Sequence, residues 1–436
     1  MGALLLAMTP AESGPPSSPK IIALAGAIAR GDSAALADFW KDVERVHTPV
    51  MESIPDSPRE MWVTFLWRGL PDQPSAGPHV LGQIGTTTGP VEMRAAFALE
   101  QLPRSDVWYR TFRLPALARL SYHLAWRLGD GRKGEPDPVT FENVAYDVFV
   151  DALNPRRYTV RWSDSSRPVR TSYVDGPGAS PDRFVAERPN LLRGKLEAID
   201  FPGHKPGDRR YISIYTSHGA DLGCARCDLI VLFDAAPFLS AIPTPTILDN
   251  LQTDGFLGPL VAVFVGNSPT EDRASDLRPS PKLSAFLRLE LLPWLRQRYQ
   301  FTHDPRRTVI GGSSLGGLAA AYAAFANSDL FGNVISLSGA HWWWPGYSAG
   351  SDVTRLLNSE SGWLTHEYAK APKLSLRFYA DVGTWEGAVM LLPNRAFRDV
   401  LVAKGYEVEY QEHVGGHDPV SWRPALTDAL KKMLRR

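Results

Sequence analysis

One short segment limits what this chain can fold into more than any other: the pentapeptide Gly312-Ser313-Ser314-Leu315-Gly316. The β-branched run 307–310 precedes it, and the alanine-rich stretch 318–324, typical of a helix, follows it. The segment therefore predicts a strand, a sharp turn with a serine at its apex, and a helix. Glycines on either side of Ser314 allow strand and helix to approach closely, so the turn can lift the serine hydroxyl out of the sheet.

This arrangement is the nucleophile elbow of α/β-hydrolases. The pattern G-x-S-x-G also occurs by chance, and a turn rich in Gly and Ser can be a simple loop or an anion-binding nest. The strand before the turn and the helix after it favour a true elbow. A phosphate-binding loop is excluded because no Gly-Lys-Ser/Thr follows the glycines.

Composition indicates a globular protein of two or three domains. The chain has 436 residues, of which 44% are hydrophobic and 22% charged. Its 47 basic and 47 acidic residues cancel, so no overall field attracts nucleic acid or an anionic membrane. No apolar run reaches membrane-spanning length. The two cysteines, Cys224 and Cys227, are interpreted as ordinary thiols rather than zinc ligands, and the sequence predicts nothing about oligomeric state.

The pattern along the chain predicts four segments. Residues 1–47 are expected to form a disordered Pro/Ser-rich leader and a helical segment, and residues 48–150 an all-β sandwich with aromatic, β-branched strands. Residues 151–205, rich in Pro, Gly and Arg, are expected to be a linker to the domain 206–436. The apolar start, residues 1–8, lacks a basic leader, which favours the cytoplasm; the alternative is the periplasm, if it belongs to a signal peptide.

The last segment has the pattern of an α/β domain. Continuous apolar strands at 211–215, 229–233 and 261–265 alternate with helical segments such as 282–300. Strands of this kind belong to a mostly parallel sheet covered by helices on both faces. The predicted fold is therefore an α/β-hydrolase domain preceded by an all-β sandwich.

A serine nucleophile needs a base, usually a histidine oriented by a carboxylate, and in α/β-hydrolases the chain order is Ser, Asp/Glu, His. His417 lies on a Gly-rich loop after the strand-like run 407–410, where the late histidine is expected, and His413 is its competitor. Two carboxylates, Asp381 and Glu386, follow the strand 374–379. Position alone does not separate them as the acid.

The oxyanion hole needs two main-chain N–H donors. One is predicted to be that of Leu315, directly after the nucleophile. The second is expected from the loop that ends the strand 229–233, where the small residues Ala235 and Ala236 permit close approach.

These residues, taken together, resemble the enterochelin (enterobactin) esterases. The likeness runs over about residues 60–436, and its α/β part consists of Gly312 to Gly317, Leu337-Ser338-Gly339 before three tryptophans, Gly383 with Glu386 and Asn394, and Gly415-Gly416-His417-Asp418 with Trp422-Arg423. The N-terminal part consists of the run 63–68 and Asp106-Val107-Trp108, which look like that family's β-sandwich.

The resemblance implies a function and separates the two carboxylates. In that family the triad acid lies three residues after the glycine that follows the strand, which favours Glu386 over Asp381. The family hydrolyses the ester bonds of ferric catecholate siderophores, cyclic or linear triesters of 2,3-dihydroxybenzoylserine, and so releases iron. It implies no cofactor and no protein-bound metal. The sandwich is expected to pack beside the mouth of the site and to help close over a bulky substrate, because pockets favour domain interfaces.

Substrate contacts are expected from aromatic and basic side chains. A stacking wall for catechol rings is predicted from Trp342, Trp343 and Trp344. Arg273 and Arg423 are predicted as cationic partners of the anionic ferric complex. The alternative is that the tryptophans fill the space between the domains and that the arginines pair with Asp272 and Asp418.

Two other functions stay open. A general carboxylesterase of the esterase D type, acting on feruloyl or acyl esters, shares the elbow and the Gly-Gly-His loop. Thirteen tryptophans also suit a non-catalytic protein that binds glycan or another protein. Against the second alternative, Ser314, Glu386 and His417 are all present at workable positions.

Overall fold

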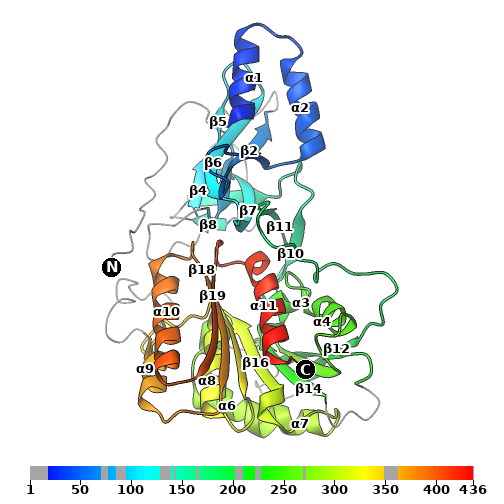
Figure 1. The fold of residues 1–436 in the computed structure, drawn as a ribbon, viewed down its shortest axis with the longest axis vertical. Coiled ribbons are helices and arrows are strands. Elements are labelled where there is room, and N and C mark those ends of the chain that lie inside the picture. The colour runs from blue at the N-terminus through cyan, green and yellow to red at the C-terminus, as the bar shows by residue number, and fades with distance from the viewer. Residues whose placement is uncertain are drawn as a thin grey trace.

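The computed structural model describes residues 18–69, 77–84, 95–127, 139–141, 144–163, 166–201, 210–220, 227–268, 272–347 and 362–435. Within these ranges the chain forms a β-sandwich domain, drawn at the top of Figure 1, and an α/β domain below it. This is the predicted fold class.

Two helices begin the described chain and pack on the sandwich. α1 (Pro19–Ala29) and α2 (Ala35–Val46) bury apolar side chains such as Leu24 and Val43 in one cluster with Leu66 and Val107 of the sandwich strands. The described part of the predicted leader, residues 18–47, is therefore an integral layer of the N-terminal domain.

The sandwich has two antiparallel sheets. The first has the order β1-β2-β6-β5 and the second β10-β11-β7-β3-β4, with the hairpin β8–β9 attached to β7. Their bounds are β1 Val50–Ser53, β2 Glu60–Arg68, β3 His79–Gly82, β4 Ala95–Ala98, β5 Glu100–Gln101, β6 Val107–Pro115, β7 Arg119–Arg127, β8 Val139–Phe141, β9 Val144–Phe149, β10 Arg157–Val160 and β11 Val169–Asp175. Apolar residues that alternate along these strands meet between the sheets.

The expected linker, residues 151–205, is the main correction. Strand β11 pairs with β7, so the sandwich continues to Asp175, and β12 (Lys195–Phe201) already belongs to the sheet of the α/β domain. β10 and β12 are edge strands, which need few apolar residues, whereas β11 lies between β10 and β7. Pro, Gly and Arg surround these strands, so composition concealed them.

The α/β domain is built on an eight-stranded sheet with the order β12-β13-β15-β14-β16-β17-β18-β19. The six strands β15, β14, β16, β17, β18 and β19 are parallel. At the edge, β13 runs antiparallel to both of its neighbours, β15 and β12. Their bounds are β13 Arg210–Thr216, β14 Asp228–Phe233, β15 Leu260–Val265, β16 Thr308–Ser313, β17 Asn333–Leu337, β18 Arg377–Gly383 and β19 Glu407–His413.

Helices cover both faces of this sheet. One face packs on α6 (Pro281–Ala285), the π-helix η1 (Phe286–Leu291), α7 (Leu292–Arg296), α8 (Leu315–Ala326), α9 (Trp363–Lys370) and α10 (Gly387–Ala403). The other packs on α3 (Ala235–Leu239), α4 (Thr244–Thr253) and α11 (Pro419–Met433). Two short helices, α5 (Arg273–Leu277) and the 3-10 turn η2 (Pro305–Arg307), complete the described set. In Figure 1 the start of α11 lies directly beneath the sandwich.

Two further expectations bear on the cell compartment. Cys227 is disulfide-bonded, so the interpretation as ordinary thiols is wrong for it; a Cys-x-x-Cys spacing suits a disulfide as well as two thiols. None of the helices in the described ranges has the length and apolar character needed to span a bilayer.

A buried ion pair fastens the antiparallel edge to the parallel sheet. Arg210, at the start of β13, pairs with Asp276 of α5, with 6% and 1% of their side chains exposed. Two hydrogen bonds join the Arg210 guanidinium to the Asp276 carboxylate, and one of them measures 2.7 Å. Asp276 also accepts from the Ser268 N–H at 2.9 Å. The guanidinium stacks on Phe286.

We expect Asp276→Ala to lower the free energy of unfolding by about 3–5 kcal/mol, because it leaves a buried guanidinium without its counter-ion. Urea unfolding measures this loss. The double variant Arg210→Met with Asp276→Leu removes both charges and should recover most of it. As a control, Arg395→Ala breaks an exposed pair with Glu412 and should cost less than about 1 kcal/mol. An Asp276→Ala loss no larger than that of the control would contradict this account.

Candidate active site

Ser314 stands at the apex of the turn between β16 and α8. Its backbone has φ 58° and ψ −122°, a strained conformation for a residue with a side chain. The turn is tight because a Cβ on Gly312 would lie 2.6 Å from the Gly316 carbonyl carbon. The half-buried Ser314 is therefore presented at the carboxyl edge of the sheet, as a nucleophile elbow requires.

His417 and Glu386 meet at the same edge. Glu386 lies between β18 and α10, and His417 on the loop between β19 and α11. His417 Nδ1 is 2.6 Å from Glu386 Oε2, and the two side chains are 9% and 0% exposed. Burial raises the pKa of Glu386, but the neighbouring His417 outweighs it and the pKa is lowered, so the carboxyl stays ionised. This contact leaves Nε2 of His417 free to act as a base.

Further donors hold the Glu386 carboxylate in place. Its Oε1 accepts the Ser338 hydroxyl at 2.5 Å and the Gly383 N–H at 2.7 Å. Ser338 in turn accepts the Trp422 indole N–H at 2.9 Å, and the Trp422 ring meets His417 edge to face with centroids 4.9 Å apart. Trp422 of α11 and Ser338 of the loop after β17 thus orient both Glu386 and His417.

The other candidates, Asp381 and His413, form a second pair with each other. His413 Nδ1 lies 3.1 Å from Asp381 Oδ2, although the two are not aligned for a straight hydrogen bond. Burial opposes a charge on His413, yet the Asp381 carboxylate raises its pKa; burial also raises the pKa of Asp381. Since Asp381 faces His413 and Glu386 faces His417, the geometry favours Glu386 as the partner of His417.

The predicted oxyanion donors lie at two adjacent helix starts. Leu315 begins α8, and Ala235 and Ala236 begin α3, so their N–H groups have no acceptor within the helices. The strands before these helices, β16 and β14, are parallel neighbours. The Asp234 carboxylate lies against the elbow, because a Cβ on Gly316 would be 2.8 Å from its Oδ2.

The two predicted cationic contacts differ in exposure. Arg273 binds Asp234 with two hydrogen bonds of 2.7 and 2.6 Å, and 36% of its side chain is exposed. Arg423 is only 7% exposed: it donates to the Ala241 carbonyl at 2.7 Å and lies over the rings of Tyr158 and Tyr173. Arg423 therefore joins the domains instead of presenting a charge to a ligand, and its expected partner Asp418 instead caps α11.

The three tryptophans do not form one wall. Trp343 is 4% exposed and packs in the core of the α/β domain, and Trp344 is 6% exposed. Trp342 alone of the three is half-exposed; its indole N–H approaches Met390 Sδ at 3.1 Å. The predicted stacking surface is thus reduced to Trp342. Trp343 has a structural role, but it lies in the α/β core and not in the space between the domains that the alternative proposed.

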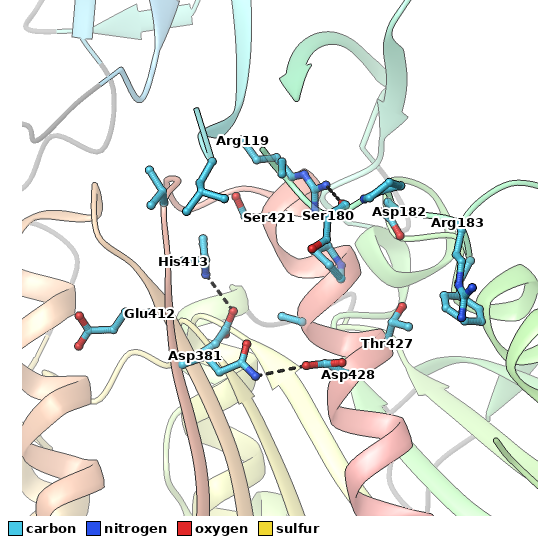
Figure 2. Close-up of a pocket in the computed structure, with 18 of the residues that line it drawn as sticks. Arg119, Ser180, Asp182, Arg183, Asp381, Glu412, His413, Ser421, Thr427 and Asp428 are labelled. Atoms are coloured by element: carbon cyan, nitrogen blue, oxygen red, sulfur yellow. Dashed lines mark hydrogen bonds and ion pairs between the residues drawn. The ribbon is translucent and has the colours of Figure 1, made fainter. Parts of the chain in front are cut away.

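Figure 2 shows a separate cavity of about 510 Å³. Its lining includes the Asp381–His413 pair, Arg119 of the sandwich and Asp182 of the connecting segment, but none of Ser314, Glu386 and His417. Burial raises the pKa of Asp182 to about 6. No group of three His, Cys, Asp or Glu side chains within the described ranges is arranged to hold a metal.

Sequence reasoning missed the residues that support the His417–Glu386 pair. Ser338 and Trp422 were noted only within family motifs, although a serine ending a strand one position before a glycine was a usable signal. Gln83 accepts a hydrogen bond from the His417 N–H and came from a part of the sequence with no motif.

Comparisons with known proteins identify the family of this chain. Residues 205–433 match the family described as putative esterase, and residues 62–184 match the N-terminal domain of enterochelin esterases. The iron(III) enterobactin esterase of Dickeya dadantii is 28% identical over 413 residues, covering 91% of this chain and 92% of that protein. The iron(III) salmochelin esterase of Escherichia coli O6:H1 is 26% identical, covering 94% and 96%.

Solved structures share the fold. The ferric enterobactin esterase of Salmonella typhimurium superposes with a TM-score of 0.72 at 23% identity, covering 91% of this chain and 98% of that one. The Shigella flexneri enterobactin esterase, crystallised in the presence of enterobactin, gives 0.69 at 22%, covering 91% and 97%. This chain belongs to the esterase family and carries the enterochelin esterase N-terminal domain, which confirms the resemblance seen in its motifs.

We expect Ser338→Ala to lower esterase kcat by about 10- to 100-fold with little change in KM, since the Glu386 carboxylate loses a donor that fixes its direction. Ser336→Ala is the matched control: Ser336 is equally buried, on the strand β17 that directly precedes Ser338, but bonds His341. Steady-state kinetics on p-nitrophenyl butyrate compares the two. Equal kcat losses in both variants would show that the effect is structural.

Asp182 gives a pH dependence of stability. Its folded pKa of about 6 exceeds the ordinary value of 3.8, so the folded state binds the proton more tightly and loses stability as pH rises from about 4 through 6. Asp182→Asn should therefore stabilise the protein at pH 8 by about 1 kcal/mol, an amount reduced for partial exposure, and should make no difference below pH of about 4. Urea unfolding at both pH values checks this; a gain at low pH alone would contradict the sign.

Proposed function

We propose that this esterase hydrolyses the ester bonds of ferric catecholate siderophores, enterobactin-like trilactones or their linear derivatives, and thereby releases iron. The observation that carries the proposal is the similarity over both domains to proteins named enterobactin and salmochelin esterases, each covered over nine-tenths of its length. The Ser314, Glu386 and His417 constellation supports ester cleavage at the carboxyl edge of the sheet.

The proposed reaction starts at Ser314. His417 takes the hydroxyl proton at Nε2 while the serine oxygen bonds to the ester carbonyl carbon, and Glu386 stabilises the imidazolium through Nδ1. The carbonyl oxygen becomes an oxyanion that accepts the N–H of Leu315 and one from Ala235 or Ala236. When the C–O bond breaks, the leaving seryl alcohol takes the proton from His417. Water, deprotonated by the same histidine, then attacks the acyl-enzyme and frees the acid and Ser314.

Recognition in this proposal rests on few exposed groups. A ferric tris-catecholate is anionic, whereas the chain is neutral overall, so the attraction must be local. Of the predicted contacts, Arg273 and Trp342 keep exposed surface. The Asp234 carboxylate offsets part of the Arg273 charge. The iron is cargo of the substrate, and no resident metal or cofactor takes part in the proposed steps.

The compartment stays a prediction. The sequence predicts the cytoplasm, with the periplasm as the alternative. The disulfide at Cys227 supports the periplasmic alternative, because disulfides persist in oxidising compartments. Fractionation of cells expressing the full chain, followed by immunoblotting, distinguishes the two.

We expect the purified protein to convert ferric enterobactin into linear oligomers and monomers of 2,3-dihydroxybenzoylserine, resolved by chromatography. Because a triad acts as a unit, Ser314→Ala and His417→Ala should each lower kcat by about 10⁴-fold or more, and Glu386→Ala by less. A far larger loss for Asp381→Ala than for Glu386→Ala, in a folded protein, would assign the acid to Asp381.

Two other results would replace the proposal. Turnover of p-nitrophenyl butyrate or feruloyl esters with none of enterobactin, with or without iron, would make the protein a general carboxylesterase. No turnover of any ester by the wild type would favour a non-catalytic binding protein.

A further inference from the structure

The loop that carries His417 is held by the N-terminal domain. The Arg119 N–H, at the start of β7, donates to the Val414 carbonyl at 3.0 Å, and Arg119 forms a parallel β-bridge with Gly415. Two residues further along β7, the Ser121 N–H donates to Asp418 Oδ2 at 3.1 Å. The two ends of the loop 414–418 are therefore fixed to a strand of the sandwich.

Gln83 makes the contact nearest to the imidazole. It follows β3, is 4% exposed, and its Oε1 accepts the main-chain N–H of His417. Its side chain also fills the space where a Cβ on Gly416 would stand, so this position of the loop accommodates only glycine. One side chain of the sandwich thus shapes two consecutive residues of the loop.

The acid side of the pair has a similar anchor. Trp385, directly before Glu386, is 5% exposed and belongs to the apolar core of the sandwich together with Val80 and Leu120. Its N–H donates to the Gly415 carbonyl at 3.0 Å, and this bond links the turn that carries Glu386 to the loop that carries His417. Both members of the His417–Glu386 pair are therefore flanked by residues that the sandwich holds.

We propose that Gln83 is a positioning residue for His417, so that the sandwich acts in catalysis on every ester, small or large, beyond the substrate-capping role expected from the sequence. This inference rests on the proposed role of His417 as the base. The Gly415-Gly416 segment is conformationally free, and without an anchor it would hold His417 in the productive orientation for a smaller fraction of the time. Gln83 removes that freedom from the other domain.

The test removes the side-chain oxygen of Gln83 that accepts the His417 N–H and keeps a side chain of similar size. Gln83→Met should lower kcat on p-nitrophenyl butyrate by about 10- to 100-fold with KM nearly unchanged, and Gln83→Glu, which keeps an acceptor oxygen, should restore most of it. Gln101→Met is the matched control, because exposed Gln101 of the same domain bonds only the Ser105 carbonyl through its side chain. It should leave kcat unchanged.

A second readout does not depend on turnover. The proton between His417 Nδ1 and Glu386 should give a downfield ¹H NMR resonance, assigned by its loss in His417→Ala. We expect this resonance to broaden or vanish in Gln83→Met and to persist in Gln83→Glu and Gln101→Met. Gly416→Ala places a Cβ where the Gln83 side chain lies and so disturbs the same contact. If Gln83→Met does not fold, Gly416→Ala should give the result expected of it.

The outcomes separate this inference from the proposed function. A Gln83→Met protein with normal kcat and an unchanged resonance would overturn the positioning role. If the protein cleaves no ester but its resonance still broadens or vanishes in Gln83→Met, the positioning role would be upheld and the esterase mechanism would be contradicted.

Discussion

The contact between the Glu386 carboxylate and His417 sets the requirements that the rest of the site meets. A fully buried carboxylate is strongly disfavoured unless donors surround it. Here three donors converge on it: the imidazole of His417, the hydroxyl of Ser338 and the N–H of Gly383. Each comes from a different loop at the carboxyl edge, so the loops after β17, β18 and β19 are fixed relative to one another through one side chain.

That same requirement explains why two domains are needed. His417, the proposed base, lies on a loop with two consecutive glycines, which has little stiffness of its own. Rigidity comes instead from β7 and Gln83 above it and from Trp422 at the start of α11. The aromatic ring of Trp385 extends this support into the sandwich core. The geometry of the His417–Glu386 pair and the packing of the two domains therefore depend on the same contacts.

Local signals made the fold predictable and pointed to the candidate site residues. The elbow, the apolar parallel strands and the Gly-rich loop of His417 each leave a short-range pattern, and each lies where expected. The acid could not be fixed from position because Asp381 and Glu386 follow one strand five residues apart, and only side-chain direction separates them. The sequence interpretation also assigned Arg423 and Trp343 to the substrate, although contacts made across the fold bury them. Gln83 lies 334 positions from its partner and carries no motif, so nothing local could have pointed to it.

The central claim is that Ser314 is a nucleophile activated by His417 within this two-domain frame. Labelling with diethyl p-nitrophenyl phosphate, followed by peptide mass spectrometry, tests it most directly, since the reagent phosphorylates an activated serine irreversibly. The account predicts one diethylphosphoryl group on Ser314 of the wild type, and labelling slower by at least about 100-fold in His417→Ala. An adduct on any other residue, or equal labelling rates in the two proteins, would contradict it.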